Sequence, residues 1–199
     1  TAIDAVTRYN EIHLPRVFYC IIGEGELRAR LDEYLTRRRI REQIALSGFV
    51  PDAGRYLGAF DIFFLPSKKE GFPYALLEAG SAGIASIASN AGGIPEIVTS
   101  GENGITKHPD DTEGFVDALY EYTKDRERRA HFGNALRARV IGEFSLEQMV
   151  MKTVALYLPA SGRGGGQTMQ GASHSQHVFL RHALMLAIAE TMHQRAAEA

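Results

Sequence analysis

Two carboxylates, Glu70 and Glu78, flank the start of an expected helix in the stretch KEGFPYALLEA, with seven residues between them. A carboxylate on the helix can accept two hydrogen bonds from a vicinal diol, and the free N–H groups of a helix start favour a phosphate. A nucleoside diphosphate sugar offers a ribose diol, a diphosphate and further hydroxyls. Two solvated acids would show the same spacing, so the spacing alone leaves both interpretations open.

The loop before this helix favours close approach of a ligand. Gly71 has no Cβ and lets a ligand reach the backbone, and Pro73 suits the first position of a helix. The loop follows the apolar run DIFFLP, and ligands of parallel α/β sheets bind beyond the carboxyl ends of strands. We therefore predict that Glu70 in the loop and Glu78 on the helix hold opposite ends of one ligand.

Strand-like apolar runs alternate along the chain with helical patterns. The expected strands cover residues 17–22, 44–50, 62–65, 84–89 and a short stretch near Ile105. The first expected helix is marked by leucines at every fourth position, Leu27, Leu31 and Leu35. Polar caps mark three more helices: Asp52 before residues 53–60, Asp110 or Asp111 before the helix that follows, and the capping box of Ser145 and Gln148. Pro73 and Pro95 are each expected to open a helix, and residues 125–140 are expected to form another. This alternation predicts an α/β fold, a Rossmann-like parallel sheet flanked by helices.

Composition narrows the class of protein. The chain has 199 residues, 45% of them apolar, which is enough for a sizeable core. The net charge of -2 argues against a dedicated nucleic-acid binder. One cysteine, Cys20, lies in an apolar run and indicates a buried thiol in a reducing, cytoplasmic compartment. The seven histidines show no metal-ligand spacing, so no metal and no cofactor is predicted.

Composition also divides the chain. Residues 1–158 are predicted to form one domain. Residues 159–177 are rich in Gly, Ser and Gln and are typical of a linker. Residues 178–199 carry an apolar stripe at helical spacing and predict a C-terminal helix.

Six short stretches follow one another in a recognisable order. They are G-E-G at residues 23–25, SGFVP at 47–51, the run at 61–67, E-G-F-x-x-x-x-x-E at 70–78, NAGGIPEIV at 90–98 and GENG at 101–104. This ordered set resembles the donor-binding, C-terminal domain of retaining GT-B glycosyltransferases, family four (glycosyl transferases group one). The resemblance covers residues 1–158 and implies binding of a nucleotide-sugar donor.

The resemblance implies roles for the E-G-F stretch. Glu78 matches the glutamate that holds the ribose hydroxyls. Glu70 matches the glutamate beside the donor sugar and is the implied catalytic residue. Gly71 and Phe72 match backbone contacts near the sugar and the diphosphate.

Other loops are implied to line the same site. Gly25 matches a loop at the diphosphate end, and Phe49 and Val50 match a loop at the base end. Gly93 has two interpretations, a lining of the sugar pocket or a plain tight turn. The implied donor is a UDP-, GDP- or ADP-sugar, and the residues specify neither the base, the sugar nor the acceptor.

The start of the chain departs from the family. A full enzyme carries an N-terminal acceptor domain, and its donor domain opens with a strand ending in Gly-Arg with a Lys a few residues on. Residues 1–6 resemble the helix after that strand. That strand is central, so the strands beginning at Val17 and Ile62 are expected to face a gap or to recruit another segment.

Three functions stay open on these grounds. The first is the donor domain of a retaining, hexosyltransferase-type glycosyltransferase, inactive without its acceptor domain. The second is a non-catalytic nucleotide-sugar-binding module. The third is a glycosidase with Glu70 and Glu78 as its acid pair, which requires both carboxyl groups across one cleft.

Two further contacts are expected. The first concerns the expected gap between the strands beginning at Val17 and Ile62 and the apolar stripe of residues 178–192. Together they favour self-association of the chain, or a C-terminal tail that covers the open surface of its own domain. Arg37, Arg38, Arg39 and Arg41 have two interpretations, a weak peripheral contact with an anionic membrane or a solvated helix end.

Overall fold

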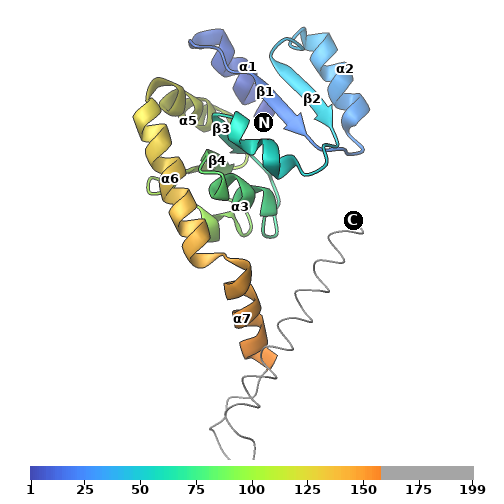
Figure 1. Cartoon of the computed structure of the whole chain (residues 1–199). Helices are drawn as coiled ribbons and strands as arrows, with labels where there is room; N and C mark the ends of the chain where they lie inside the picture. The colour runs from blue at the N-terminus through green and yellow to red at the C-terminus, as the bar shows by residue number, and fades with distance from the viewer. Residues whose placement is uncertain (158–199) are drawn as a thin grey trace, which may run out of the picture. The chain divides into compact units, whose positions relative to one another are not determined.

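The computed structural model describes residues 1–157, and residues 1–142 form one compact unit that is separate from the part of the chain beginning at Glu143. Helices and strands alternate as predicted (Figure 1). The strands are β1 (Tyr19–Ile22), β2 (Ile44–Gly48), β3 (Ile62–Leu65), β4 (Ala85–Ser89) and β5 (Ile105–Lys107). The helices of the first unit are α1 (Ala2–Ile12), α2 (Arg28–Arg38), the 3-10 helix η1 (Ala53–Ala59), α3 (Tyr74–Ser81), α4 (Ile94–Ile97), α5 (Thr112–Lys124) and α6 (Arg126–Glu143), which ends at the boundary.

The five strands form two parallel sheets, and the predicted α/β fold is confirmed. One sheet has the order β1-β2, with Tyr19 opposite Ile44 and Cys20 opposite Ala45. The other has the order β3-β4-β5, with Ile62 opposite Ala85. No hydrogen bonds join β1 to β3, so the gap expected between these two strands is confirmed.

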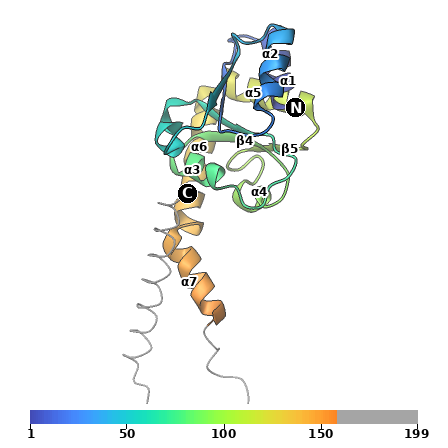
Figure 2. The same ribbon diagram turned by 90° about the vertical axis from the view of Figure 1, so that its right-hand side faces the viewer.

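The core gathers around β4, which is buried along its whole length. Both of its edges are paired, and α5 and α3 contact it from opposite faces (Figure 2). On one face, Ile87 belongs to a cluster with Phe115 of α5 and Tyr9 of α1. On the other face, Ile84 belongs to a cluster with Leu57 of η1. β4 also buries two serines, whose hydroxyl groups are satisfied: Ser86 donates to the Ile84 carbonyl oxygen, and Ser89 donates to the Ser67 carbonyl oxygen.

Four local expectations need correction. Strand β2 ends at Gly48, where φ is +74°, so Val50 lies in the following loop. Asp52 does not cap η1 through its side chain, because its backbone is left-handed and its carboxylate pairs with Arg55 at 3.7 Å. Pro73 is the cap of α3 and not its first residue. Leu27 precedes α2 and is 56% exposed.

Two predicted caps are confirmed. The Asp111 carboxylate accepts a hydrogen bond from the Gly114 N–H at 2.8 Å and begins α5. After Glu143, the Ser145 hydroxyl accepts a hydrogen bond from the Gln148 N–H at 3.2 Å and begins α7 (Leu146–Tyr157). The predicted linker at residues 159–177 and helix at residues 178–199 lie outside the described residues.

Candidate functional site

The predicted site residues gather at one edge of the parallel strands. Gly25 follows β1, Phe49 and Val50 follow β2, Glu70 follows β3, and Gly93 follows β4. Parallel strands end on the same side, and ligands of such sheets bind beyond that edge. The structure therefore places these residues where the sequence predicts, with Glu78 on the neighbouring helix α3.

The backbone of the loop that carries Glu70 packs directly against Gly92 and Gly93, the glycines after β4. The Gly93 N–H donates to the Gly71 carbonyl oxygen at 2.8 Å. A Cβ on Gly92, where φ is +55°, would overlap the Glu70 carbonyl oxygen, and one on Gly93 would overlap the Gly71 oxygen. Both glycines are thus required for this contact, which holds Glu70 half-buried at the edge.

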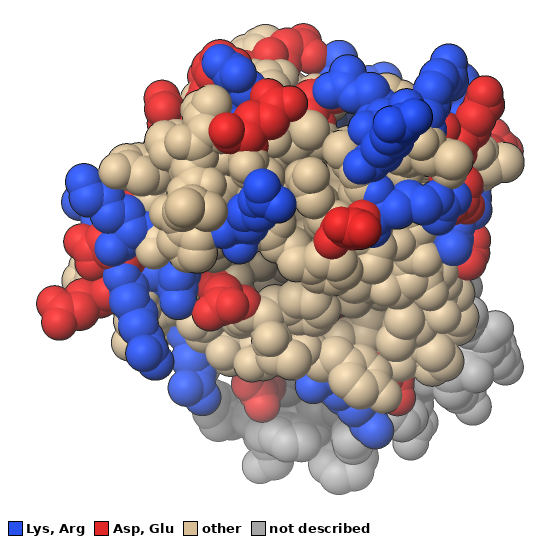
Figure 3. Space-filling model, turned by 90° about the horizontal axis from the view of Figure 1, so that it is seen from above, with Lys and Arg blue, Asp and Glu red and all other residues tan. Residues whose placement is uncertain are grey.

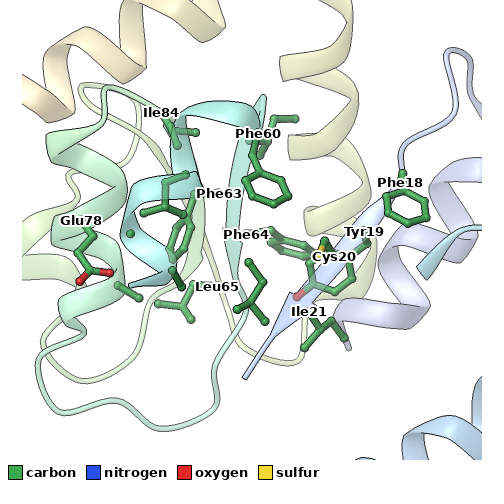
Figure 4. A pocket seen from close by; sticks show the side chains of 16 residues that line it. Phe18, Tyr19, Cys20, Ile21, Phe60, Phe63, Phe64, Leu65, Glu78 and Ile84 are labelled. Atoms are coloured by element: carbon green, nitrogen blue, oxygen red, sulfur yellow. The ribbon is translucent and has the colours of Figure 1, made fainter. Parts of the chain in front are cut away.

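Glu78 lies on the second turn of α3 and is exposed. Its carboxylate lies against η1, since a Cβ on Gly54 would come within 3.3 Å of its carboxyl carbon. The side chain lines a cavity of about 330 Å³ together with Gly54 and Ala75 (Figure 4). Because Gly54 has no side chain, the Glu78 carboxylate can pack against η1. The sequence pattern does not reveal this contact.

The two glutamates do not share this cavity. Glu78 is one of its lining residues and Glu70 is not. A glycosidase needs its two carboxyl groups to face each other across one cleft. The arrangement therefore does not support a glycosidase that uses this pair.

Glu24 joins two of the loops and is a residue that sequence analysis missed. Its Oε1 accepts a hydrogen bond from the Phe49 N–H at 3.3 Å and lies 3.6 Å from Nη1 of Arg28. A Cβ on Gly48 would approach the same oxygen to 2.5 Å. The signal available in the sequence was an acid between two glycines directly after a strand.

Apolar surface is exposed beside these polar groups. Phe49 is 72% exposed and Phe72 is 38% exposed. Aromatic rings at the edge of a sheet offer flat surface on which a ligand ring or a sugar can pack. Both rings thus fit a ligand with apolar faces as well as charges.

A salt bridge ties the β3 loop to the loop after β5. Nζ of Lys68 lies 2.5 Å from Oδ1 of Asp110. The hydrogen bond from Lys68 holds the pKa of the Asp110 carboxyl below its usual range. The Ser89 hydroxyl also donates to the Ser67 carbonyl oxygen. The loops at this edge are thus held by neighbouring strands as well as by their own turns.

The arginine cluster at residues 37–41 lies away from this edge, at the end of α2. Arg37 pairs with Glu33 at 3.4 Å, and Arg41 pairs with Asp32 at 3.0 Å. Figure 3 shows basic side chains gathered at the upper right of one face, with acidic side chains beside them. The pairing favours a solvated helix end, and membrane contact stays a prediction.

Among residues 1–157, no three His, Cys, Asp or Glu side chains gather in a way that could hold a metal ion. Within the same residues, no helix is both long and apolar enough to span a membrane.

Residues 1–139 match the sequence profile described as "Glycosyl transferases group 1". The chain belongs to this family. The family resemblance seen in the six stretches is therefore confirmed, and it covers the loops that form the candidate site.

Curated relatives of this group 1 glycosyltransferase chain are longer than the chain itself. It is 32% identical over 146 residues to the UDP-Gal:alpha-D-GlcNAc-diphosphoundecaprenol alpha-1,3-galactosyltransferase of Escherichia coli, covering 73% of the chain and 38% of the relative. It is 28% identical to the N-acetyl-alpha-D-glucosaminyl L-malate synthase of Bacillus anthracis, covering 69% of the chain and 36% of the relative. The group 1 chain thus spans less than half the length of these relatives.

Solved structures share the fold. HepE of Anabaena in complex with UDP superimposes with a TM-score of 0.69 at 20% identity, covering 78% of the group 1 chain and 45% of HepE. The C-terminal domain of the group 1 glycosyl transferase LpcC of Francisella tularensis superimposes with a TM-score of 0.63 at 25% identity, covering 72% and 78% of the two chains. The Rossmann-like fold is therefore shared with GT-B enzymes.

Proposed function

We propose that the chain is the donor-binding part of a retaining glycosyltransferase and binds a nucleoside diphosphate sugar at the carboxyl edge of its strands. The main support for the proposal is the close backbone contact of the Glu70 loop with Gly92 and Gly93, beside the start of α3. HepE has been solved with UDP and with UDP-glucose, which supports this class of donor.

The proposed residue roles follow from position. Glu78 accepts hydrogen bonds from the ribose diol. Glu70 faces the donor sugar, and the N–H groups of Gly71 and Phe72, before α3, face the diphosphate. Gly25 lines the diphosphate end, and Phe49 with Val50 lines the base end. Gly93 holds the Glu70 loop in place through its hydrogen bond to the Gly71 carbonyl oxygen.

The chemistry that this site would support is glycosyl transfer. The bond between the anomeric carbon and the diphosphate oxygen breaks, and a bond forms from that carbon to the oxygen of an acceptor hydroxyl, whose proton leaves with the departing diphosphate. Negative charge develops on the departing diphosphate, and fixed N–H dipoles at the start of α3 stabilise it. The family resemblance implies that a separate acceptor domain binds the acceptor, so residues 1–199 alone are expected to give no turnover.

Glu78→Ala is expected to weaken binding of the nucleotide by about 1.5–3 kcal/mol, the range for hydrogen bonds to a charged group. Calorimetric titration with UDP, GDP, ADP and their sugars measures this loss and identifies the base. Glu102→Ala removes an exposed acid in the turn before β5 and serves as the matched control. Equal affinity in Glu78→Ala and the unaltered chain would remove Glu78 from the site.

Glu24→Ala is expected to weaken nucleotide binding by roughly three- to tenfold, because it removes one hydrogen bond that holds the Phe49 loop. Glu26→Ala removes an exposed carboxylate from the same loop and should leave affinity unchanged. Parallel calorimetric titrations of the two variants separate the specific contact from the loss of negative charge. Equal losses in both would assign the effect to charge alone.

A further inference from the structure

Helix α4 is a single turn that touches the Glu70 loop at its first end. It consists of Ile94–Ile97 only and is about 6 Å long, and the side chains of both isoleucines are completely buried. Its first end carries Gly93, whose N–H donates to the Gly71 carbonyl oxygen in the Glu70 loop. A turn of this length is not stable by itself in water, so packing and the contacts at its other end must hold it in place.

The side chain of Asn103 holds the second end of α4. Its Oδ1 accepts a hydrogen bond from the Thr99 N–H at 2.7 Å, and its Nδ2 donates to the Ile97 carbonyl oxygen at 3.0 Å. The residue is only 4% exposed, so its amide is buried with both a donor and an acceptor satisfied. The last carbonyl groups of a helix need partners of this kind, because the helix itself provides none.

Arg139 of α6 holds the same end of α4 from a different element. Its Nη2 donates to the Glu96 carbonyl oxygen at 2.9 Å, and its Nη1 donates to Oγ1 of Thr99 at 2.8 Å. Two nitrogens of one planar guanidinium thus reach α4 and the loop that follows it at the same time. A lysine ammonium is a single point of charge and cannot reproduce this geometry.

The turn that carries Asn103 is itself packed on the core. The Gly101 N–H donates to the Gly104 carbonyl oxygen at 2.9 Å and closes the turn. A Cβ on Gly104 would approach Cγ1 of Val98 to 2.7 Å and the Ser86 carbonyl oxygen to 3.1 Å. Because Ser86 belongs to the buried strand β4, the turn presents Asn103 to α4 from a fixed place.

We propose that Asn103 and Arg139, here called the α4 clamp, are positioning residues that act on Glu70 through α4. The α4 clamp fixes the second end of α4, the buried isoleucines fix its rotation, and Gly93 at its first end fixes the Glu70 loop. Loss of a clamp hydrogen bond therefore lets Gly93 and Gly71 separate while the sheet stays folded. Neither clamp residue has to touch a ligand for this effect.

The α4 clamp acts on the loop before α3 and not on Glu78. The Glu78 carboxylate packs against η1, and none of the four hydrogen bonds of the α4 clamp involves η1 or α3. In the proposed function, on which this step rests, the Glu70 loop faces the diphosphate and the sugar, and Glu78 faces the ribose. We therefore expect the α4 clamp to affect recognition of the diphosphate and sugar, and to leave recognition of the base and ribose almost unchanged.

Conservative variants test the α4 clamp, because complete removal of a buried polar side chain destabilises a whole domain. Arg139→Lys keeps the positive charge and loses the paired donors. Asn103→Asp keeps the acceptor Oδ1 and loses the donor to the Ile97 carbonyl oxygen. Arg137→Lys and Asn134→Asp make the same exchanges at exposed positions of α6 and are the matched controls.

Amide exchange reports on the α4 clamp without any ligand. The Gly93 N–H exchanges when its hydrogen bond to Gly71 opens, whereas the Ile87 amide of the buried strand β4 exchanges when the core unfolds. We expect both clamp variants to accelerate exchange at Gly93 by at least about tenfold more than at Ile87. The two control variants should leave the ratio of the two rates unchanged.

Two outcomes of this measurement overturn the positioning role. Equal acceleration at Gly93 and Ile87 would show that the α4 clamp supports only the fold, and an unchanged rate at Gly93 would show that α4 does not depend on it. Thr99→Val removes only the side-chain acceptor of Arg139 and provides the same comparison if a clamp variant does not fold.

A titration then couples the α4 clamp to the proposed function. UMP carries the base and the ribose, and UDP-glucose adds the second phosphate and the sugar. In Arg139→Lys, the Kd for UDP-glucose is expected to rise at least about fivefold and the Kd for UMP less than about twofold. GMP with GDP-mannose and AMP with ADP-glucose provide the same comparison for the other bases.

The failure of each proposal has its own signature. Equal losses of affinity for the monophosphate and the sugar nucleotide would contradict the action of the α4 clamp on the Glu70 loop. If no member of the three pairs binds the unaltered chain, the proposed donor function fails, and the ratio of exchange rates at Gly93 and Ile87 still decides whether the α4 clamp positions the loop.

Discussion

Gly92→Ala is expected to lower donor affinity by at least about 100-fold and the free energy of unfolding by about 2–4 kcal/mol. The residue holds φ at +55°, a conformation that an L side chain adopts only with strain. Its new Cβ would also overlap the Glu70 carbonyl oxygen, so the Glu70 loop would have to move away from residue 92. Chemical unfolding and calorimetric titration with the donor nucleotide measure the two effects.

Gly58→Ala is the matched control for this substitution. A Cβ on Gly58 meets no atom within 4 Å, and its φ lies outside the left-handed region. Its stability and donor affinity should stay within experimental error of the unaltered chain. If Gly92→Ala bound the donor as tightly as Gly58→Ala does, the backbone contact between Gly92 and the Glu70 loop would not be needed for donor binding.

Glu70→Gln, introduced into the full-length protein, is expected to lower kcat by about 10²–10⁴-fold while the Kd for the nucleoside diphosphate changes less than about twofold. Glu70 precedes α3. In the proposed site, Glu70 faces the sugar and Glu78 faces the ribose. Steady-state kinetics together with nucleotide titration separate the two quantities.

Glu78→Ala provides the contrast within the same protein, because it should raise the Kd for the nucleotide. A Glu70→Gln variant that lost nucleotide affinity in proportion to kcat would make Glu70 a general binding residue. A variant with unchanged turnover would remove it from the reaction altogether.

The elements with strong local signals were predictable from sequence. β3 has the predicted bounds, Ile62–Leu65, because Asp61 and Pro66 bracket a short apolar run. Its neighbour β2 ends two residues earlier than predicted, because Gly48 turns to positive φ where the apolar pattern continues.

The contacts that shape the site were not predictable in this way. The hydrogen bond from the Phe49 N–H to Glu24 joins residues 25 positions apart, and the contact of Gly54 with Glu78 depends on how η1 packs on α3. Neither contact leaves a periodic or spacing signal. For Gly93, sequence left a turn and a site role equally open, and the structure shows the backbone contact to Gly71 that makes it indispensable to the loop.

The central claim is that a nucleoside diphosphate binds at the carboxyl edge of the strands. The most direct test is an NMR titration of the ¹⁵N-labelled chain with UDP, GDP and ADP in turn, since chemical shifts report even weak binding. We predict saturable shifts, for at least one nucleotide, at the amides of Gly25, Phe49, Gly71 and Gly93. Shifts confined to other residues, or none with any of the three up to about 10 mM, would contradict the claim.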